Sequence, residues 1–201
     1  MRKSITFIFL LIASLNLLSQ NQVFDVCPIK IGQEIPVDVT VQNPLGESVK
    51  FAQILESKKL IVVFYRGGWC PYCTRHLSAL GMLKDEIDSL GFTLVGITPD
   101  RFDSLAVSQL KSESDYEIYS DSKAELIRAF GLAWEIDSAT YVNYRDQYKM
   151  DLETWSGETH HLLPVPAVYL IVDGVIQFNY VNPNYKIRLR TETLLAILKS
   201  L

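Results

Sequence analysis

The sequence predicts an α/β sandwich with a mixed central β-sheet, and three observations predict this class. Residues 60–65 and 92–98 are apolar runs rich in β-branched side chains, and a helical pattern follows each of them. Residues 167–180 contain two more apolar runs joined by Asp173-Gly174, which is a strong hairpin signal. The 201 residues are 48% hydrophobic and 21% charged, an ordinary globular composition with enough length for one core.

The first twenty residues have the layout of a secretory signal peptide. Arg2 and Lys3 precede an apolar run over residues 5–18, which is too short for a comfortable membrane span, and polar residues follow. A buried N-terminal helix is the alternative. We expect residues 1–20 to be a signal peptide and residues 21–201 to form one domain, exported to a periplasm or secreted. No stable membrane insertion is expected after the signal is removed.

The charge balance excludes one class of function. The chain has 19 Lys and Arg residues against 23 Asp and Glu, a net charge of −4. Removing residues 1–20 lowers the number of basic residues from 19 to 17 and takes no acid, so the net charge becomes −6. Nucleic-acid binding depends on a basic surface, so no nucleic-acid partner is expected.

The elements follow one another in a consistent order. Residues 22–50 are rich in turn formers, with a short β-type piece at 37–41, and residues 60–65 predict a fully buried central strand. A helix is expected to begin at Cys70 or Pro71, since proline is favoured in a first turn, and to end at Gly91. The later elements are a strand at 92–98, a helix at 105–110, a strand at 116–119, a helix at 123–130, a hairpin of 167–172 and 175–180, and a helix at 191–201.

Residues 131–163 fit no regular unit and are expected to be an insertion before the last hairpin. Long loops in compact domains are usually functional or disordered, so we expect this one to cover something. Its aromatic residues are expected to pack it onto the sheet, and an aromatic wall for a substrate pocket is the alternative. They include Tyr141, Tyr144, Tyr148 and Trp155. We expect His160 and His161 to be a solvated loop pair, with a place at the rim of the site as the alternative.

The stretch Trp69-Cys70-Pro71-Tyr72-Cys73 carries the chemistry. Two thiols separated by two residues at a strand-to-helix turn can close a small disulfide ring. The unpaired N–H groups and the dipole of the helix start stabilise a thiolate on the first cysteine, Cys70. A thiolate attacks disulfides and peroxides, and the second thiol can release the adduct. The spacing therefore predicts a redox-active dithiol.

Two other interpretations of the dithiol are weaker. A zinc site needs further soft ligands, but only Cys27 and three histidines remain, with no paired spacing. A purely structural disulfide is possible in an exported protein, although a two-residue gap at a helix start is typical of redox motifs. Cys27 is expected to have no catalytic role.

Several residues near the dithiol could tune it. Arg66 and Arg75 could add positive potential. His76 lies three residues after Cys73, so it could face that sulfur; a half-exposed helix position is the alternative.

The chain resembles the peroxiredoxin-like branch of the alkyl hydroperoxide reductase/thiol-specific antioxidant (redoxin) family. The residues that carry the resemblance are the dithiol stretch 64–73, Gly96 to Asp100, residues 121–132 and residues 164–185, and the match runs in order from about Ile31 to Leu201. It implies a thioredoxin-like three-layer sandwich. It also implies reduction of a hydroperoxide, with electrons returned by a thioredoxin-like donor and with no metal, flavin or haem cofactor.

The resemblance points to two different sites. When the Phe-Tyr at the strand end is aligned, Cys73 occupies the family's peroxidatic position, whereas Arg66 replaces the family's proline and Cys70 replaces its threonine or serine. The family's later arginine falls near Val165 and is missing. Instead, Val165-Pro166-Ala167 resembles the cis-proline site of thioredoxins, which flanks their dithiol.

From the residues themselves, Cys70 is expected to be the more exposed thiol, because it stands at the helix end while Cys73 lies one turn inside. We therefore expect Cys70 to attack and Cys73 to resolve. The residues expected to shape the site are Arg66, Trp69, Pro71, Tyr72 and Pro166. A thiol–disulfide oxidoreductase acting on exported protein disulfides is the rival function, and a non-catalytic module with a structural disulfide is the third.

Overall fold

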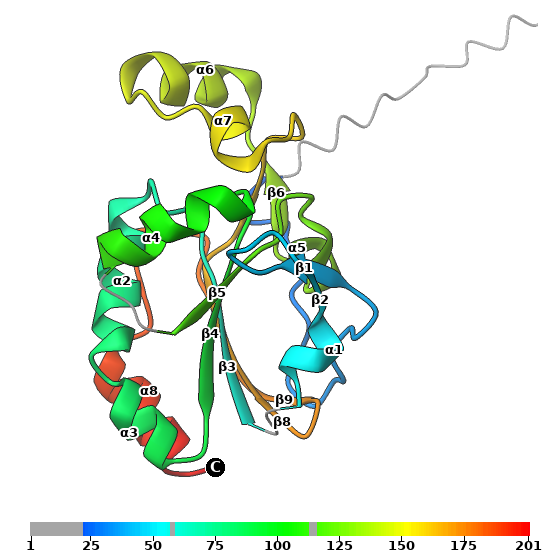
Figure 1. The fold of residues 1–201 in the computed structure, drawn as a ribbon, viewed down its shortest axis with the longest axis vertical. Coiled ribbons are helices and arrows are strands. Elements are labelled where there is room, and N and C mark those ends of the chain that lie inside the picture. The colour runs from blue at the N-terminus through cyan, green and yellow to red at the C-terminus, as the bar shows by residue number, and fades with distance from the viewer. Residues whose placement is uncertain (1–21, 57–58, 113–115) are drawn as a thin grey trace, which may run out of the picture.

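The computed structural model describes residues 22–56, 59–112 and 116–201, so the expected signal peptide lies outside the described residues. Its centre is a seven-stranded sheet in the order β2-β1-β5-β4-β3-β8-β9 (Figure 1). The strands of the sheet are β1 (Thr40–Gln42), β2 (Ser48–Lys50), β3 (Lys59–Phe64), β4 (Thr93–Thr98), β5 (Glu117–Ser120), β8 (Ala167–Val172) and β9 (Val175–Val181). The sheet is mixed, as predicted, because β3, β4 and β5 are parallel whereas β8 and β9 are antiparallel.

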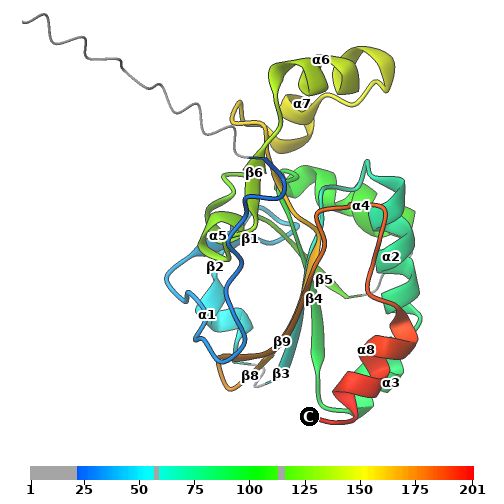
Figure 2. The ribbon, with the colours of Figure 1, turned by 180° about the vertical axis from the view of Figure 1, so that it is seen from behind.

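Helices cover both faces of this sheet, which gives the predicted three layers. The helices α2 (Pro71–Gly81), α3 (Lys84–Ser89), α4 (Leu105–Ser112) and α8 (Thr191–Leu198) lie on one face (Figure 1). The short helices α1 (Phe51–Ile54) and α5 (Glu125–Ala129) lie on the other, as the view from behind also shows (Figure 2). A 3-10 turn, η1 (Phe102–Ser104), precedes α4.

The central strand β3 explains why the two cores are separate. Val62 and Phe64 pack into the core under α1 and α5, whereas Ile61 and Val63 pack into the core under α2 and α8. Successive side chains of a strand point to opposite faces, so a strand that is covered on both sides reads as one continuous apolar run. Burying each such side chain contributes about 1.5–3 kcal/mol.

Two of the expected boundaries are wrong. The helix expected from Cys70 to Gly91 is interrupted, because α2 ends at Gly81 and α3 begins at Lys84. Glycine is a poor helix former, and Leu83 leaves helical geometry at φ −98° and ψ 4° while still packing on the core, so the leucine repeat continues across the break. The strand expected at 37–41 begins at Thr40, where its partner β2 becomes available.

The largest correction concerns residues 131–163, which were expected to lack regular structure. They contain β6 (Ala133–Glu135), α6 (Ser138–Gln147) and α7 (Leu152–Ser156), and β7 (Leu162–Pro164) closes the segment. Asp137 caps α6 by accepting a hydrogen bond from the Thr140 N–H, and Asp151 caps α7 in the same way from the Glu153 N–H. These helices pack on a small core of their own. Few of their residues are therefore apolar, and the sequence lacks the repeat of apolar residues every three or four positions that marks a helix on a large core. That core is made by Ile136, Tyr141, Leu152 and Leu163.

The insertion stands at the end of the sheet where β3 runs into α2. Its base is a two-stranded sheet in which β6 pairs with β7, and α6 and α7 lie above it (Figure 1). Over the described parts of the chain, no helix has the length and apolar character needed to span a membrane.

Candidate active site

The dithiol lies in the connection between β3 and α2. Cys70 is the residue before the first helical position, Pro71, and its carbonyl oxygen accepts hydrogen bonds from the Cys73 and Thr74 N–H groups at 2.9 and 3.0 Å. Both cysteines are free thiols. The redox pair is therefore at the helix start, as the spacing predicted, at the carboxyl end of the central strand.

Two glycines allow the chain to turn there. A Cβ at Gly67 would lie 2.2 Å from Trp69 Nε1, and the φ of +149° at this residue is one that other residues rarely adopt. A Cβ at Gly68 would lie 2.0 Å from Ser108 Oγ. The turn is thus packed so closely that neither position accepts a side chain without displacement.

Asp100 holds this turn from the neighbouring strand and was not among the expected site residues. Its Oδ2 accepts a hydrogen bond from the Gly68 N–H at 2.7 Å, and a weaker one from Ser108 Oγ at 3.4 Å. The residue is 1% exposed, and burial raises the pKa of its carboxyl to about 7. The sequence signal for Asp100 was its position just after β4, because β4 is parallel to β3 and the carboxyl ends of parallel strands meet at one edge of the sheet.

The expectation that Cys70 is the more exposed cysteine is wrong, because both residues are 1% exposed. Side chains of the insertion and of the loop before α8 surround the end of the helix, which the sequence could not show. The two thiols nevertheless differ in acidity. The hydrogen bond from the Cys73 thiol, helped by the nearby Arg66, outweighs burial and lowers the pKa of Cys70 from 9.0 to about 6. Burial raises the pKa of Cys73 well above its ordinary value.

Arg66 is buried beside Cys70 and is surrounded by aromatic rings. Its guanidinium lies 4.2 Å from the centroid of the Tyr185 ring and 5.0 Å from that of Trp69, and Nη2 donates to the Tyr144 hydroxyl at 2.7 Å. Cation–π contacts of this kind stabilise a guanidinium that has lost its water. Arg66 therefore joins the dithiol turn to the insertion.

Arg188, in the loop between β9 and α8, was not foreseen. Its Nη2 donates to Cys73 Sγ at 3.4 Å. The family resemblance placed the missing arginine near Val165, and that residue is fully buried between β7 and β8, where its N–H donates to the Leu132 carbonyl. The alternation of cations at Lys186, Arg188 and Arg190 was a possible signal for a charged site. Arg75, by contrast, lies 5.9 Å from the Tyr72 ring and is not among the charges that shift either thiol.

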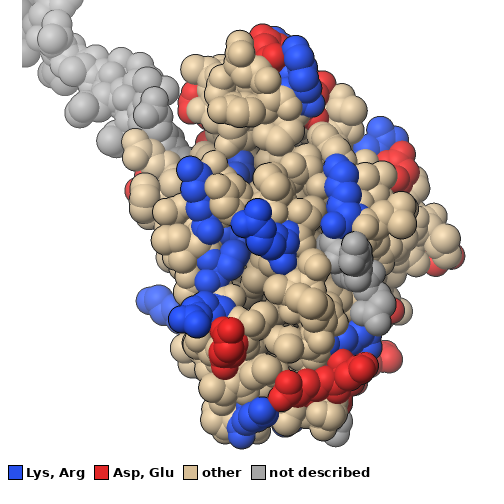
Figure 3. All heavy atoms as spheres, turned by 90° about the vertical axis from the view of Figure 1, so that its left-hand side faces the viewer, with Lys and Arg blue, Asp and Glu red and all other residues tan. Residues whose placement is uncertain are grey.

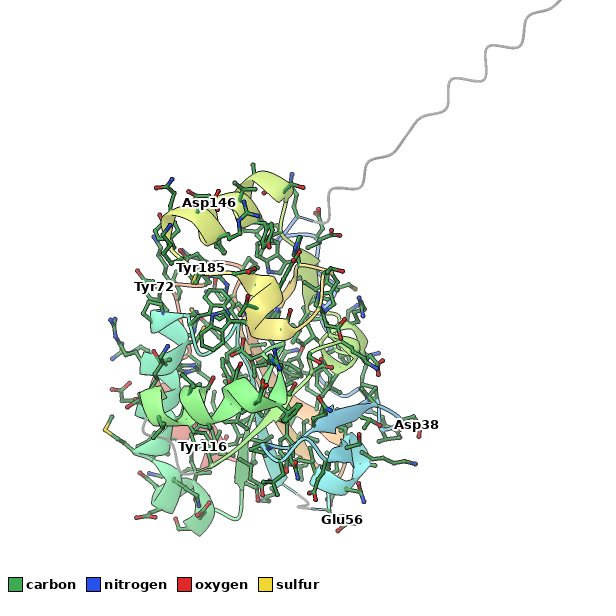
Figure 4. All side chains as sticks on the ribbon, turned by 45° about the horizontal axis from the view of Figure 1, so that its top comes forward. Asp38, Glu56, Tyr72, Tyr116, Asp146 and Tyr185 are labelled. Carbon is green, nitrogen blue, oxygen red and sulfur yellow. The ribbon has the colours of Figure 1, made fainter. Side chains whose placement is uncertain are left out.

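Cys70 lines a cavity of about 420 Å³ with aromatic walls. Tyr72 and Tyr185 pack edge to face at 5.7 Å below α6, the helix that carries Asp146 (Figure 4). The insertion supplies the opposite wall, so the aromatic wall that the sequence offered as the alternative is present. The lining residues are Arg66, Trp69, Cys70, Pro71, Tyr72, Asn143, Tyr144, Tyr148, Met150 and Tyr185.

The histidines lie elsewhere than expected. His76 is buried rather than half-exposed, and burial together with Arg188 lowers its pKa to about 4. His160 donates from Nε2 to the Ser122 carbonyl at 2.7 Å. His161 lies 2.7 Å from Glu153 and stacks on Tyr141, so these two histidines are half-buried parts of the insertion rather than a solvated pair.

Pro166 does not form the expected cis-proline site. No peptide bond in the described residues is cis, and Pro166 continues the extended path from β7 into β8, where the trans form is the favoured one. It borders a small void with His76 and Arg188, away from the cavity that Cys70 lines. Within residues 22–56, 59–112 and 116–201, no group of three or more His, Cys, Asp or Glu residues is placed to hold a metal ion.

Comparisons with known proteins agree on one family. The AhpC/TSA family model matches residues 31–179. A putative peroxiredoxin bcp of Haemophilus influenzae is 29% identical over 107 residues, which cover 52% of this chain and 66% of that protein. Peroxiredoxin bcp1 of Schizosaccharomyces pombe is 26% identical over 103 residues, which cover 51% of this chain and 52% of that protein. The chain thus spans between half and two thirds of these relatives.

Solved structures confirm the predicted thioredoxin-like fold. Peroxidoxin BcpB from Mycobacterium tuberculosis superposes with a TM-score of 0.65 at 17% identity, over 86% of this chain and 98% of that one. Reduced Prx3 from Vibrio vulnificus superposes with a TM-score of 0.68 at 17% identity, over 85% of this chain and 99% of that one.

Proposed function

Because the chain belongs to the AhpC/TSA family, we propose that it is a thiol peroxidase that reduces hydroperoxides through Cys70 and Cys73. Two curated relatives that it matches are named peroxiredoxins. The observation that carries the proposal is the environment of Cys70, which lines the 420 Å³ cavity and has its pKa lowered to about 6. At pH 7, a thiol with that pKa is roughly nine-tenths thiolate, whereas an ordinary cysteine is a few per cent ionised.

The reaction proceeds in two steps that balance atoms and electrons. The Cys70 thiolate attacks the terminal oxygen of the hydroperoxide, the O–O bond breaks, and an alcohol (or water, from hydrogen peroxide) leaves. Cys70 is then a sulfenic acid. The Cys73 thiol attacks the Cys70 sulfur, a disulfide forms, and water leaves. Reduction of that disulfide by two electrons restores both thiols.

Arg66 and Arg188 provide the positive charge for this sequence. Arg66 acts on Cys70 and favours its thiolate, and Arg188 contacts the Cys73 sulfur at 3.4 Å. The family alignment favours the opposite order, in which Cys73 attacks. However, Cys73 is not part of the cavity lining, and burial disfavours its thiolate. We therefore assign the attack to Cys70 and the resolving step to Cys73.

The rival function, exchange with exported protein disulfides, has less support. Both cysteines are 1% exposed, and the insertion walls the cavity in front of Cys70, so a small peroxide reaches the sulfur more easily than a folded protein does. We propose that a thioredoxin-like donor nevertheless returns electrons to the disulfide. We also propose that residues 1–20 direct export.

Peroxide consumption by single-cysteine variants tests the proposal, in a Cys27→Ser background because Cys27 is exposed. Cys70→Ser should abolish reaction with hydrogen peroxide. Cys73→Ser should complete one turnover and leave a sulfenic acid on Cys70 that dimedone traps. Full turnover by Cys70→Ser would reverse the assignment of roles. Faster reduction of insulin than of peroxide by the unmodified dithiol would support the rival function.

A further inference from the structure

A groove next to the dithiol gathers positive charge on a chain whose net charge is −4. The groove has a volume of about 360 Å³ and lies between α2 and the start of α8. On this face several Lys and Arg side chains lie close together in the middle, with Asp and Glu side chains both nearer the top and lower down (Figure 3). Its lining contains four cations and one carboxylate, and the charged residues are Arg75, Lys186, Arg188, Arg190 and Glu192.

Three of the four cations, Arg75, Lys186 and Arg190, are exposed and available to a ligand, whereas Arg188 already donates to the Tyr185 and Ile187 carbonyls and to Cys73 Sγ. Glu192 reaches only Arg190, at 3.5 Å, and both side chains are more than 70% exposed. An exposed pair of this kind contributes little and leaves the cation free to exchange partners. His76 also borders the groove, but burial lowers its pKa to about 4, so it is neutral at pH 7 and the positive charge comes from the arginines and the lysine.

The groove is continuous with the redox site. Tyr72 lines both the groove and the cavity of Cys70, so the two share one wall. Arg188 lines the groove and also donates to Cys73 Sγ. A molecule that places carboxylates in the groove can therefore reach over Tyr72 towards the cysteines.

We propose that this groove binds the carboxylates of a small thiol, which reduces the Cys70–Cys73 disulfide as a second reductant beside the thioredoxin-like donor. The inference rests on the proposed function, which supplies that disulfide. Guanidinium groups bind carboxylates through paired hydrogen bonds, and 360 Å³ lies within the range of small-molecule sites. The burial of both cysteines, each 1% exposed, favours a small reductant over a folded protein.

The reduction balances with two molecules of thiol. The first, as its thiolate, attacks the Cys70 sulfur, and Cys73 leaves as a thiolate next to the Arg188 guanidinium. The second attacks the mixed disulfide on the thiol's sulfur, so Cys70 leaves as a thiolate and the disulfide of the small thiol is released. Two electrons pass from the two thiols to the protein, and Cys73 takes up the proton.

The test compares a charged and an uncharged reductant on the same protein. The disulfide is prepared with diamide, so that the result does not depend on peroxide turnover and the two proposals can fail separately. Its reduction by mercaptosuccinate, which carries two carboxylates, and by 2-mercaptoethanol is followed by acid quenching and alkylation. The groove variant is Lys186→Glu with Arg190→Glu. The matched control, Lys30→Glu with Lys123→Glu, makes the same change of charge at exposed lysines outside the groove.

At an ionic strength of about 0.02 M, the groove variant should slow mercaptosuccinate at least about fivefold, because attraction of this kind raises association rates about 10- to 1000-fold. The control should not, and the rate with 2-mercaptoethanol, whose thiolate carries no carboxylate, should change much less than the rate with mercaptosuccinate. For each thiol, the rate with the variant is divided by the rate with the wild type, so the different pKa values of the two thiols do not affect the result. Equal effects of groove and control variants would overturn the proposal. So would a groove variant that slows an acidic thioredoxin but not mercaptosuccinate, which would assign the groove to a protein partner.

Discussion

Replacing Cys73 by alanine is expected to raise the pKa of Cys70. The hydrogen bond from the Cys73 thiol is the largest of the interactions that lower this pKa from 9.0 to about 6. A hydrogen bond to a charged group contributes about 1.5–3 kcal/mol, and one pH unit corresponds to about 1.36 kcal/mol. Loss of the donor should therefore raise the pKa of Cys70 by about one to two pH units, and the rest of the lowering comes from Arg66, the backbone N–H of residue 73 and Arg188.

Cys73→Ser is the matched control, because serine keeps a hydroxyl donor of similar size at the same place. In a Cys27→Ser background, the rate of alkylation by iodoacetamide between about pH 4 and 10 reports the thiolate fraction of Cys70 alone. The serine variant should titrate near the wild-type value and the alanine variant well above it. If the pKa of Cys70 is near 6 in both variants, the hydrogen bond from residue 73 is not the main cause of the low pKa of Cys70.

Three further predictions concern the frame of the site. Gly68→Ala places a Cβ 2.0 Å from Ser108 Oγ, so it should lower the free energy of unfolding by about 1–3 kcal/mol in urea titrations; an unchanged midpoint would contradict the packing described. Tyr144→Phe removes the hydroxyl that accepts a hydrogen bond from the buried Arg66. Amide hydrogen exchange in α6 should therefore become faster while exchange in β3 stays constant. Equal exchange rates in α6 of the variant and of the wild type would show that this hydrogen bond does not hold α6 in place. Burial raises the pKa of Asp100 from 3.8 to about 7, so between those values the folded protein holds a proton that the unfolded chain has released. Stability should therefore fall as pH rises through this window, by up to roughly 4 kcal/mol from Asp100. Burial also raises the pKa of Asp121 to about 7, so Asp100→Asn should reduce the pH slope of stability in urea titrations without removing it, and a slope equal to the wild type's would exclude Asp100 as a cause.

The helices and strands that could be predicted from the sequence are those whose position is determined by residues within the element or directly beside it. The strand at 60–65 is buried on both faces, so its apolar run is visible without any partner. The start of α2 follows from Pro71, and the hairpin turn follows from Asp173-Gly174. The dithiol belongs to the same class, because its chemistry depends on two residues that are close together in the chain.

The missed features depend on residues that are distant in the chain. Arg188 meets Cys73 across 115 positions, and Tyr144 meets Arg66 across 78, and no local pattern encodes either contact. The exposure of Cys70 was misjudged for the same reason, since the side chains that surround it come from the insertion. The helices of that insertion were missed because their caps, such as Asp137, are polar residues common in loops, and their apolar faces are short.

The pairing of β6 with β7 has a consequence for how this protein can change. Ala133 lies opposite Pro164 and Glu135 lies opposite Leu162, so the two ends of the insertion are held side by side. The segment between them has a small core of its own, and it also contacts the sandwich through Tyr144, Trp155 and His160. Such a segment can be shortened, lengthened or exchanged while β3 keeps its register with β4 and β8. The insertion's side of the cavity and the dithiol turn are therefore encoded in separate parts of the chain, so one can change in sequence while the other stays the same.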